Sequence, residues 1–426
     1  MRKGDSMKEK LFSRDFTMVV IGQIISLFGN NVLRYALPLY LLNKTHSASL
    51  FGLVSACSFI PMVVLAPVGG LVADRVNKRN VMVCLDFATA AIVVLYSTFY
   101  MHWNLVALLI TVLMLLYGIQ GAYQPAVQAS IPVLVSQENL IPGNAVINMV
   151  NSLASMLGPV LGGLVFGLWG LQPVLIISIM CFLFSAVMEI FIRIPFEKRD
   201  HEAGVFKTAR ADIQESFLFI KRDCPAIGRV GILLAMINLV LSALIIVGLP
   251  VIINEHLGFP QALGNRLCGY TQGALAAGGL LGGIISGTIG KRYDIRRSAC
   301  LLFFCTLTLL PTGLVLLLPV GRFTAYAVIT VDCFIMMAVS TLLSILLITY
   351  VQGITPNKMI GKVISLITCL VMCANPAGQA LYGFLFEQLA ASIYWIFFMA
   401  FAVCLLLTVL SRKIFAEALV QEPIAI

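Results

Sequence analysis

The sequence predicts an all-α membrane protein whose twelve transmembrane helices form two pseudo-symmetric halves of six. The first observation is the composition, because 60% of the 426 residues are hydrophobic and only 11% are charged, too few for a soluble surface. The second is a series of apolar runs, each long enough to cross a hydrocarbon core of about 30 Å, which takes about 20 helical residues. The third is an internal repeat with an offset of 217 positions.

The apolar runs follow one another along the whole chain and predict the elements. We place the helices at 16–42, 48–72, 81–101, 104–131, 143–168, 171–194, 227–253, 263–290, 298–319, 323–350, 359–386 and 390–411. Residues 1–194 are expected to form the first half and residues 227–426 the second. The hydrophilic linker at 195–226 carries Ile213, Phe217 and Ile220 at helical spacing, which predicts an amphipathic helix on the inner membrane surface, with a partner-binding site as the alternative.

The repeat is visible at the end of the second run in each half. Residues 70–79 recur in altered form as residues 287–296, and the two copies share the leading glycine and the first and last arginine. The pair Gly158-Pro159 lies the same 217 positions before Asn375-Pro376. A duplication of this size is typical of secondary transporters.

Residues of the first copy fit the loop motif between the second and third helices of the major facilitator superfamily, which this chain resembles: Gly70, Asp74, Arg75, Lys78 and Arg79. Asn77 replaces the second glycine of that motif, and we expect it to adopt the left-handed conformation of a tight turn. The resemblance implies the major facilitator fold. It also implies that Asp74 meets a helix N-terminus of the other half when the inner side closes, where the helix dipole favours a carboxylate. The alternative is that Asp74 only orders its own loop with Arg75 or Lys78.

A second motif lies in the fifth run, where Gly158, Pro159, Gly162 and Gly163 resemble the glycine-proline motif of drug exporters. Small residues let helices approach closely in lipid, and such a motif also allows a bend. We expect this helix to pack on the glycine-rich eighth helix of the other half. Further likeness, to the drug:proton antiporter branch that contains macrolide efflux proteins, is carried by Gly22-Gln23 with Ser26, Gln124-Pro125-Ala126, Ile131-Pro132 and residues 138–144.

Two positions depart from the pattern of exporters. Tyr117 stands where a fourth-helix motif of other branches has arginine, and Asn30 and Asn31 follow Gly29 where many relatives of the macrolide type carry aspartate. Both changes remove a charge that could handle protons, so the coupling ion stays open at this point.

Polar residues inside the apolar runs recur three or four positions apart, which places them on single helix faces. A polar side chain at membrane depth faces protein or water rather than lipid. The resemblance places the first, fourth, seventh and tenth helices around a central cavity. The expected cavity lining is therefore Gln23, Asn30, Arg34, Gln120, Gln124, Asn238 and Asp332. For each of these residues the alternative is that it only bridges neighbouring helices.

Two of these residues are charged. Arg34 lies ten residues before Lys44, and Asp332 ten residues after Arg322, which puts both about 15 Å below the outer surface. A charge at that depth costs about 2.5–3.5 kcal/mol on insertion scales, so each needs a partner or water. Our hypothesis is that Asp332 responds to protons, with Arg34 as its counter-charge. Alternatively, Arg34 recognises an anionic group of the substrate, or the two residues form a static ion pair.

Three further acids are expected to have lesser roles. Asp86 is two turns inside the third helix, where we expect it to pair with the basic loop or a neighbouring helix. Glu189 has Arg193 at i+4 and is expected to form an ion pair with it. Glu387 lies at an outer helix end that water can reach.

The basic residues predict the orientation. Of the 28 lysines and arginines, the outer loops keep only Lys44, Arg266 and Arg322, and Arg34 is inside the first helix. This asymmetry predicts that both termini are cytoplasmic, and it explains the net charge of +9 by anionic lipid headgroups rather than nucleic acid. The first run is too long for a signal-peptide core, so no cleavable signal is expected.

The sequence favours transport over catalysis. No acid, histidine or cysteine cluster has catalytic or metal-ligand spacing, so we expect no enzyme, no cofactor and no metal site, and the eleven cysteines are expected to be core residues. The predicted function is proton-antiport export of an amphipathic drug-like compound, such as a macrolide, across the bacterial cytoplasmic membrane by alternating access. The expected partners are a small-molecule substrate, protons and membrane lipids, and the expected state is a monomer. The alternatives are a siderophore exporter, a lysophospholipid flippase, or a non-transporting sensor on a transporter scaffold.

Overall fold

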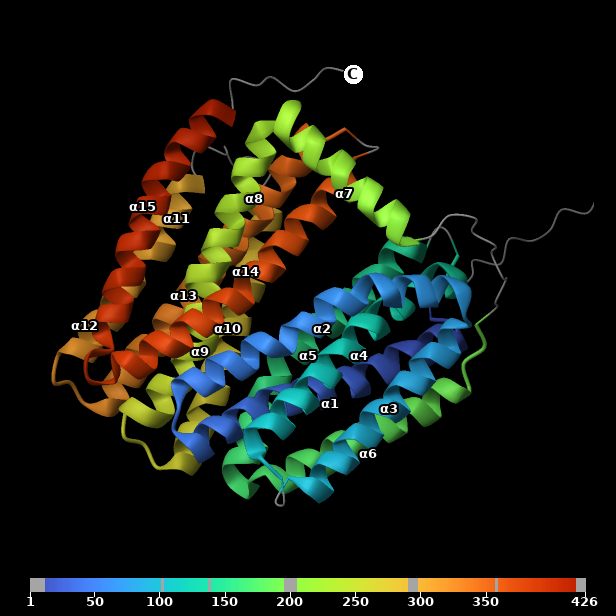
Figure 1. Ribbon diagram of the computed structural model, residues 1–426, viewed down its shortest axis with the longest axis horizontal. Coiled ribbons are helices and arrows are strands. Elements are labelled where there is room, and N and C mark those ends of the chain that lie inside the picture. Colours follow the sequence, from blue (N-terminus) through green and yellow to red (C-terminus); the bar gives the residue numbers. More distant parts are fainter. Residues whose placement is uncertain are drawn as a thin grey trace, which may run out of the picture. The chain divides into compact units, whose positions relative to one another are not determined.

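The computed structural model describes residues 12–100, 103–136, 139–194, 205–289, 298–356 and 359–418 (Figure 1). Within these residues every regular element is a helix, and eleven helical segments are long and apolar enough to cross a membrane. The predicted all-α membrane architecture is confirmed.

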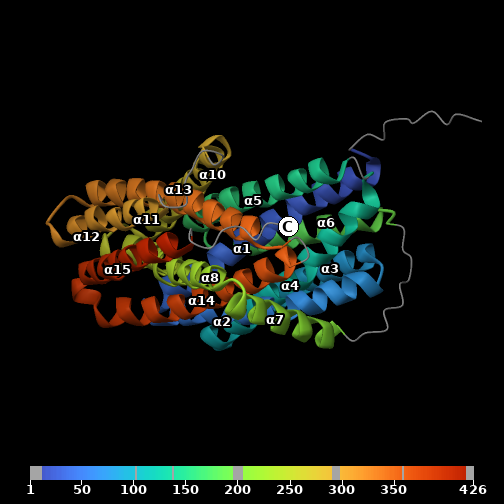
Figure 2. The same cartoon turned by 90° about the horizontal axis from the view of Figure 1, so that it is seen from above.

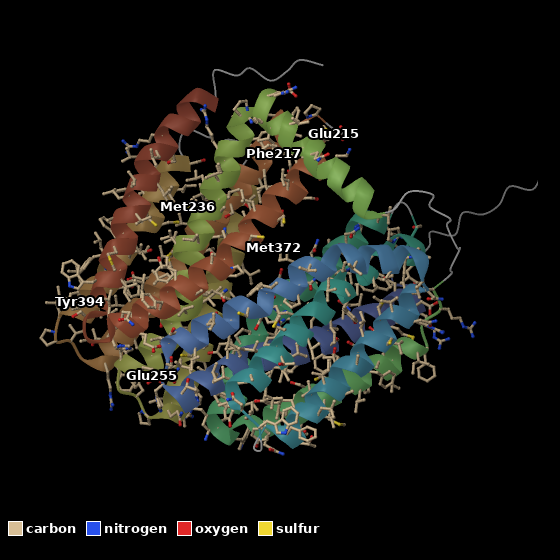
Figure 3. The ribbon with its side chains drawn as sticks, viewed as in Figure 1. Glu215, Phe217, Met236, Glu255, Met372 and Tyr394 are labelled. Carbon is tan, nitrogen blue, oxygen red and sulfur yellow. The ribbon has the colours of Figure 1, made fainter. Side chains whose placement is uncertain are left out.

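Each predicted run in the first half corresponds to one helix. These are α1 (Arg14–Thr45), α2 (Ala48–Arg75), α3 (Lys78–Phe99), α4 (Leu105–Leu134), α5 (Leu140–Trp169) and α6 (Leu171–Ile190). The predicted linker contains α7 (Val205–Arg222), on which Glu215 accepts a hydrogen bond of 2.6 Å from Lys362 and Phe217 is exposed (Figure 3). Ile213 lies outside the described side chains.

The second half contains more interrupted helices. The seventh run is α8 (Pro225–Ile237), the π-turn η2 (Asn238–Ser242), α9 (Ala243–Val251) and the π-turn η3 (Ile252–His256) in one line. It is followed by α10 (Gln261–Ile289), α11 (Ser298–Leu307) with α12 (Leu309–Leu317), α13 (Arg322–Ile354), α14 (Ile360–Gln388), the short η6 (Ala390–Ser392) and α15 (Tyr394–Ala418). Interruptions of this kind are often found at functional sites in helices.

One predicted transmembrane helix, α10, is not among the eleven apolar segments. It is 29 residues long, or about 44 Å at about 1.5 Å per residue, so its length suffices. Its described part is rich in glycine and includes Gln261, Asn265 and Gln272, which lower its mean hydropathy. The twelfth span is therefore present as a helix but differs from the others in composition.

The turn between α2 and α3 differs from the sequence prediction. Asn77 has φ −58° and ψ 117°, so it is not left-handed, and its side chain accepts a hydrogen bond of 3.0 Å from the backbone nitrogen of Arg79. The expectation of a left-handed turn at this position is wrong. An asparagine suits it because its side chain caps the first turn of α3.

The helices pack into two compact units. Unit 1 comprises residues Met1–Leu41 and Cys57–Glu202, and unit 2 comprises Leu42–Ala56 and Ala203–Ile426. In unit 1, α3 lies along α6, and in unit 2, α15 packs on α11 and α12 (Figures 1 and 2). The turn from α1 to α2, which the repeat assigns to the first half, therefore packs as part of unit 2.

The internal repeat reappears in the packing of each unit. In unit 1 a Cβ on Gly118 of α4 would lie 3.2 Å from Pro61 and 3.0 Å from Leu65 of α2. Positions 61 and 65 of α2 correspond, 217 residues later, to Gly278 and Gly282 of α10. These two glycines lie against the backbone of α13, as α2 lies against α4.

This crossing predicts opposite effects for two neighbouring glycines of α10. In Gly282→Ala the new Cβ would overlap the carbonyl oxygen of Ala338, which belongs to a rigid helix backbone, whereas a Cβ on Gly283 meets nothing within 4 Å. We expect Gly282→Ala to destabilise the protein by about 1–3 kcal/mol through overpacking. Gly283→Ala should be neutral or stabilising by about 0.5–1 kcal/mol. Thermal unfolding of the detergent-purified variants measures the difference, and equal Tm values would contradict the crossing.

Candidate functional site

Helices α1 and α4 of unit 1 are joined by a ladder of polar and aromatic contacts. Arg34 places its guanidinium carbon 3.4 Å from the centroid of the Tyr117 ring, Asn30 Nδ2 donates to Gln120 Oε1 at 3.1 Å, and Gln23 Nε2 donates to Tyr123 Oη at 2.7 Å. Residue numbers of the contacts increase along α1 while those of their partners decrease along α4, as expected for neighbouring antiparallel helices. The sequence predicted the α1 face and the amide of α4, but not the tyrosines that complete the ladder.

This ladder determines what the predicted lining residues contact. Gln23, Asn30 and Gln120 are buried, and their amides join α1 to α4, which was the alternative to a cavity lining. Gln124 and Arg34 are half-buried. Tyr117, which stands where other exporters have an arginine, receives the Arg34 cation on its ring, an attraction that strengthens when water is excluded.

Two acids of unit 1 are far more buried than the sequence indicated. Asp86 of α3 is 2% exposed and Glu189 of α6 is 0% exposed. Asp86 Oδ1 accepts from Ser26 Oγ of α1 at 2.9 Å, as expected for contact with a neighbouring helix. Glu189 Oε1 accepts from Tyr123 Oη at 2.7 Å, so its predicted ion pair with Arg193 is wrong.

The reason is that α6 ends at Ile190, so the i+4 spacing to Arg193 no longer describes one helix face. Arg193 is exposed beyond that end, and its backbone nitrogen donates to Asp15 at 3.0 Å. Sequence reasoning ranked these acids low. Their burial could have been predicted from the sequence, because both acids lie inside apolar runs.

The glycine-proline motif of α5 packs on α1. A Cβ on Gly158 would overlap the side chain of Asn31, and one on Gly162 would lie 3.1 Å from the carbonyl oxygen of Val32. Gly163 is also buried, and Pro159 is accommodated inside the helix. The predicted close approach is made with α1 in unit 1, and the expected packing on the eighth helix of the other half stays a prediction.

The residues of the predicted loop motif lie mostly in a helix. Because α2 continues to Arg75, Gly70, Asp74 and Arg75 belong to its last turns, and their side chains lie outside the described side chains. Lys78 begins α3, and Arg79 donates to Asn80 Oδ1 at 3.0 Å and to the carbonyl oxygen of Ile190 at 3.5 Å. Glu138 and residues 290–297, which include most of the second copy, lie outside the described residues. The gating role of Asp74 stays a prediction.

In unit 2, Asp332 of α13 is buried beside α12. Thr312 Oγ1 donates to its Oδ2 at 2.8 Å, and the carboxylate borders a pocket with mainly apolar walls, among them Leu244, Met336 and Phe397. Asn238 begins the π-turn η2, where its amide donates to the carbonyl oxygen of Leu234 at 3.0 Å. Arg34 and Asp332 belong to different units, so their pairing stays a prediction.

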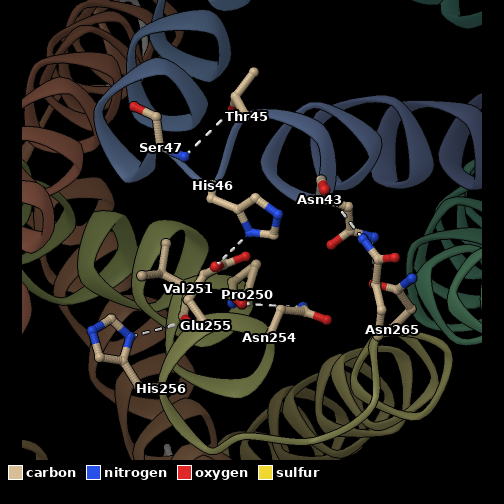
Figure 4. A network of polar contacts seen from close by, with 11 residues as sticks. Asn43, Thr45, His46, Ser47, Pro250, Val251, Asn254, Glu255, His256 and Asn265 are labelled. Atoms are coloured by element: carbon tan, nitrogen blue, oxygen red, sulfur yellow. Dashed lines mark hydrogen bonds and ion pairs between the residues drawn. The ribbon is translucent and has the colours of Figure 1, made fainter.

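A polar network surrounds the turn from α1 to α2 within unit 2 (Figure 4). His46 has φ 50°, and its Nδ1 lies 2.8 Å from Glu255 Oε2. Ser47 Oγ donates to Glu387 Oε2 at 2.6 Å, and Asn43 Nδ2 donates to Asn265 Oδ1 at 2.9 Å. Glu387 is exposed, as predicted. We call these six residues the α1–α2 turn network: Asn43, His46, Ser47, Glu255, Asn265 and Glu387.

Small residues bring the start of α2 against α14 beside this network. A Cβ on Gly52 would lie 2.8 Å from the Cα of Gly383, and one on Gly383 would lie 2.8 Å from the carbonyl oxygen of Ala48. Such a glycine crossing lets two helix backbones touch. The α1–α2 turn is therefore held in unit 2 by both polar contacts and backbone packing.

A duplicated, all-helical membrane fold with polar residues on selected helix faces defines the class of secondary transporters. The sequence model of the Major Facilitator Superfamily matches residues 19–375, and the chain belongs to this superfamily.

Its relatives include exporters. Macrolide efflux protein A of Streptococcus pyogenes is 24% identical over 413 residues, which cover 95% of this chain and 96% of that protein. The enterobactin exporter EntS of Citrobacter koseri is 24% identical over 380 residues, covering 86% of this chain and 84% of that protein.

Solved structures share the fold. The nucleoside transporter NupG matches with a TM-score of 0.71 at 11% identity, covering 95% of this chain and 99% of that one. A bacterial homologue of the iron transporter ferroportin, in an inward-facing state, matches with a TM-score of 0.69 at 17% identity, covering 95% and 98%. At these identities the likeness shows the fold alone, and it agrees with the predicted major facilitator architecture.

Proposed function

We propose that this transporter exports an amphipathic, drug-like compound such as a macrolide from the bacterial cytoplasm in exchange for protons. The observation that carries the proposal is Asp332, a carboxylate at the edge of a pocket with apolar walls. Such a site suits an apolar molecule with a cationic group, because the walls bind the apolar part and the carboxylate binds either the cation or a proton. The full-length similarity to Macrolide efflux protein A supports the substrate class.

Transport would proceed by alternating access of the two halves in the cytoplasmic membrane, with both termini inside and the chain acting as a monomer. In this proposal Arg34 is the counter-charge of Asp332 or binds an anionic group, and Gln23, Asn30, Gln120, Gln124 and Asn238 border the path. The end of α2 with Lys78 and Arg79 acts as the inner latch through Asp74. The α1–α2 turn network acts at the opposite helix ends.

A second candidate substrate is a siderophore. It is favoured by the similarity to the enterobactin exporter and by the half-buried cation of Arg34, which could recognise an anionic ligand. The two candidates share the fold and the direction of transport, and differ in the charge of the substrate.

Uptake into inverted membrane vesicles tests the proposal. With an imposed proton gradient, vesicles containing the protein are expected to accumulate a radiolabelled macrolide and a fluorescent amphipathic cation, and a proton-collapsing agent should abolish the accumulation. Vesicles from cells without the protein are the control. If neither compound moves, the drug assignment fails and a siderophore becomes the next substrate. If a compound moves regardless of the collapsing agent, proton antiport fails.

A further inference from the structure

Unit 1 contains a buried polar cluster whose two acids have no role in the proposed transport path. It lies where α1, α3, α4 and α6 meet (Figure 1) and contains Asp86 and Glu189. Helices α1 and α6 approach closely there, because Gly22 and Gly29 have no side chains. Ser185 Oγ donates to the carbonyl oxygen of Gly22 at 3.1 Å, and a Cβ on Gly29 would lie 2.8 Å from the Cβ of Cys181.

The hydrogen bonds of the cluster leave acceptors without donors. Gln23 donates to Tyr123, Tyr123 donates to Glu189 Oε1, and Ser26 donates to Asp86 Oδ1. Asp86 Oδ2, Glu189 Oε2 and Gln23 Oε1 are buried and have no hydrogen-bond partner among the described residues. All three atoms are acceptors, so none of them can donate a hydrogen bond to another. A proton on either carboxylate would supply one, because a protonated carboxyl group is a donor.

The charges around the two acids point the same way. The titratable groups that face the cluster are Asp86 from α3, Tyr123 from α4 and Glu189 from α6, while α1 contributes only the amide of Gln23 and the hydroxyl of Ser26. Neither carboxylate has a cation within 4 Å in the part of the chain that the structure describes. The guanidinium of Arg79 donates a hydrogen bond to Asn80 at the start of α3. Arg193 is exposed.

Two ionised carboxylates without a cation are expensive to bury. The effective penalty is several kcal/mol for each ion, and the two like charges also repel each other. One proton shared between them removes a charge, removes the repulsion and provides a donor. Such coupled acids titrate as a pair rather than one by one.

The geometry points to a proton-binding site formed by Asp86 and Glu189, which holds one proton between them in one stage of transport and releases it in another. This inference rests on the proposed proton antiport. A proton delivered by a hydronium ion of the aqueous phase, which becomes water, forms an O–H bond on one carboxylate oxygen, and its release to water restores the carboxylate. Ser185, whose hydroxyl donates to Gly22, lies beside Asp86, and a hydroxyl can donate to the ionised carboxylate or accept from the protonated carboxyl group. Tyr123 links Glu189 to the α1–α4 ladder, where Arg34 and Asn30 also lie.

Infrared titration of the purified protein tests the site without any substrate. The wild type is expected to show the carbonyl stretch of a protonated carboxylic acid that disappears as pH rises, and part of this stretch should be missing in Asp86→Asn with Glu189→Gln. The same part should remain in Asp332→Asn, because Asp332 contributes separately to the stretch. A wild type with no more of this stretch than the double variant, or a difference between the two that does not respond to pH, overturns the site. The last outcome would make the pair a static contact.

Transport separates this inference from the proposed function. In the vesicle assay with the macrolide, Glu189→Gln is expected to lose proton-driven accumulation and to retain exchange of labelled for unlabelled substrate. Glu215→Gln makes the same chemical change at an exposed position of α7 and should behave as wild type. If wild type moves no drug but the band titrates, the drug assignment fails and the site stands. If proton-driven transport is normal in both Asp86→Asn and Glu189→Gln, the proposed function stands and the site fails.

The variant Tyr123→Phe tests the site even if the acid-to-amide variants fail to fold. This variant removes only the hydroxyl between Gln23 and Glu189, and we expect it to shift the pH at which the band disappears rather than abolish it. An unchanged titration in a folded Tyr123→Phe protein would show that Glu189 does not belong to the titrating pair, and would overturn the two-acid site.

Discussion

Cross-linking the double variant Ser47→Cys/Glu387→Cys with a short, reducible thiol reagent is expected to lower export to the background of vesicles without the protein, and reduction is expected to restore it. In unit 2, Ser47 Oγ lies 2.6 Å from Glu387 Oε2, and Ser49 N donates to the same oxygen at 2.8 Å. The proposed alternating access would separate the α1–α2 turn from α14 in each cycle, because the repeat assigns the turn to the first half and α14 to the second. A covalent link at this point would trap one state.

The controls for this experiment follow from the cysteines of the chain. Eleven are present, and Cys84, Cys300, Cys369 and Cys373 are exposed. The parent protein and each single variant are therefore treated with the same reagent, and only the double variant should lose export reversibly. Full export by a completely cross-linked protein would show that the α1–α2 turn does not move during transport.

The second large effect is expected for Asp332→Asn. Asparagine has the same shape and can still accept the hydrogen bond of 2.8 Å from Thr312, but it cannot bind a proton or balance a cation. We expect accumulation driven by a proton gradient to fall to background while exchange of labelled for unlabelled substrate continues. The transport rate should also lose the pH dependence that is due to this residue.

The measurement is vesicle uptake with and without a proton gradient, at equal membrane abundance, with Glu215→Gln as the matched acid-to-amide control. Glu215 is exposed on α7, where it pairs with Lys362 at the surface and has no place in the proposed transport path (Figure 3). Normal proton-driven accumulation by Asp332→Asn would remove this residue from the coupling mechanism and leave Asp86 and Glu189 as the acids to account for it.

Comparison of the α1–α4 ladder with its sequence signal shows how far periodicity can lead. Helical spacing placed Gln23, Asn30 and Arg34 on one face of α1, and the structure confirms that this face meets α4. Periodicity cannot predict the depth at which two faces meet. The partners Tyr117 and Tyr123 were therefore missed, although both are encoded in a run that was already recognised as a helix.

The two buried acids show a different limit. The expected Glu189–Arg193 pair relied on a helix that continues past residue 190, but α6 ends there. Asp86 and Glu189 are 103 positions apart in sequence and belong to one cluster only because α3 lies along α6. No local pattern relates two acids at such a separation.

The sequence by itself determined the membrane class, the order of the helices, their duplication and the superfamily, because apolar length and motif spacing are properties of single segments. Only the tertiary structure decided which polar groups meet: Asp86 with Ser26, Glu189 with Tyr123, Arg34 with Tyr117, and the α1–α2 turn with unit 2 rather than unit 1. The physical reason is that a buried polar group takes its partner from whichever helix packs against it, and that choice is made by the close approach of small residues on helices far apart in sequence.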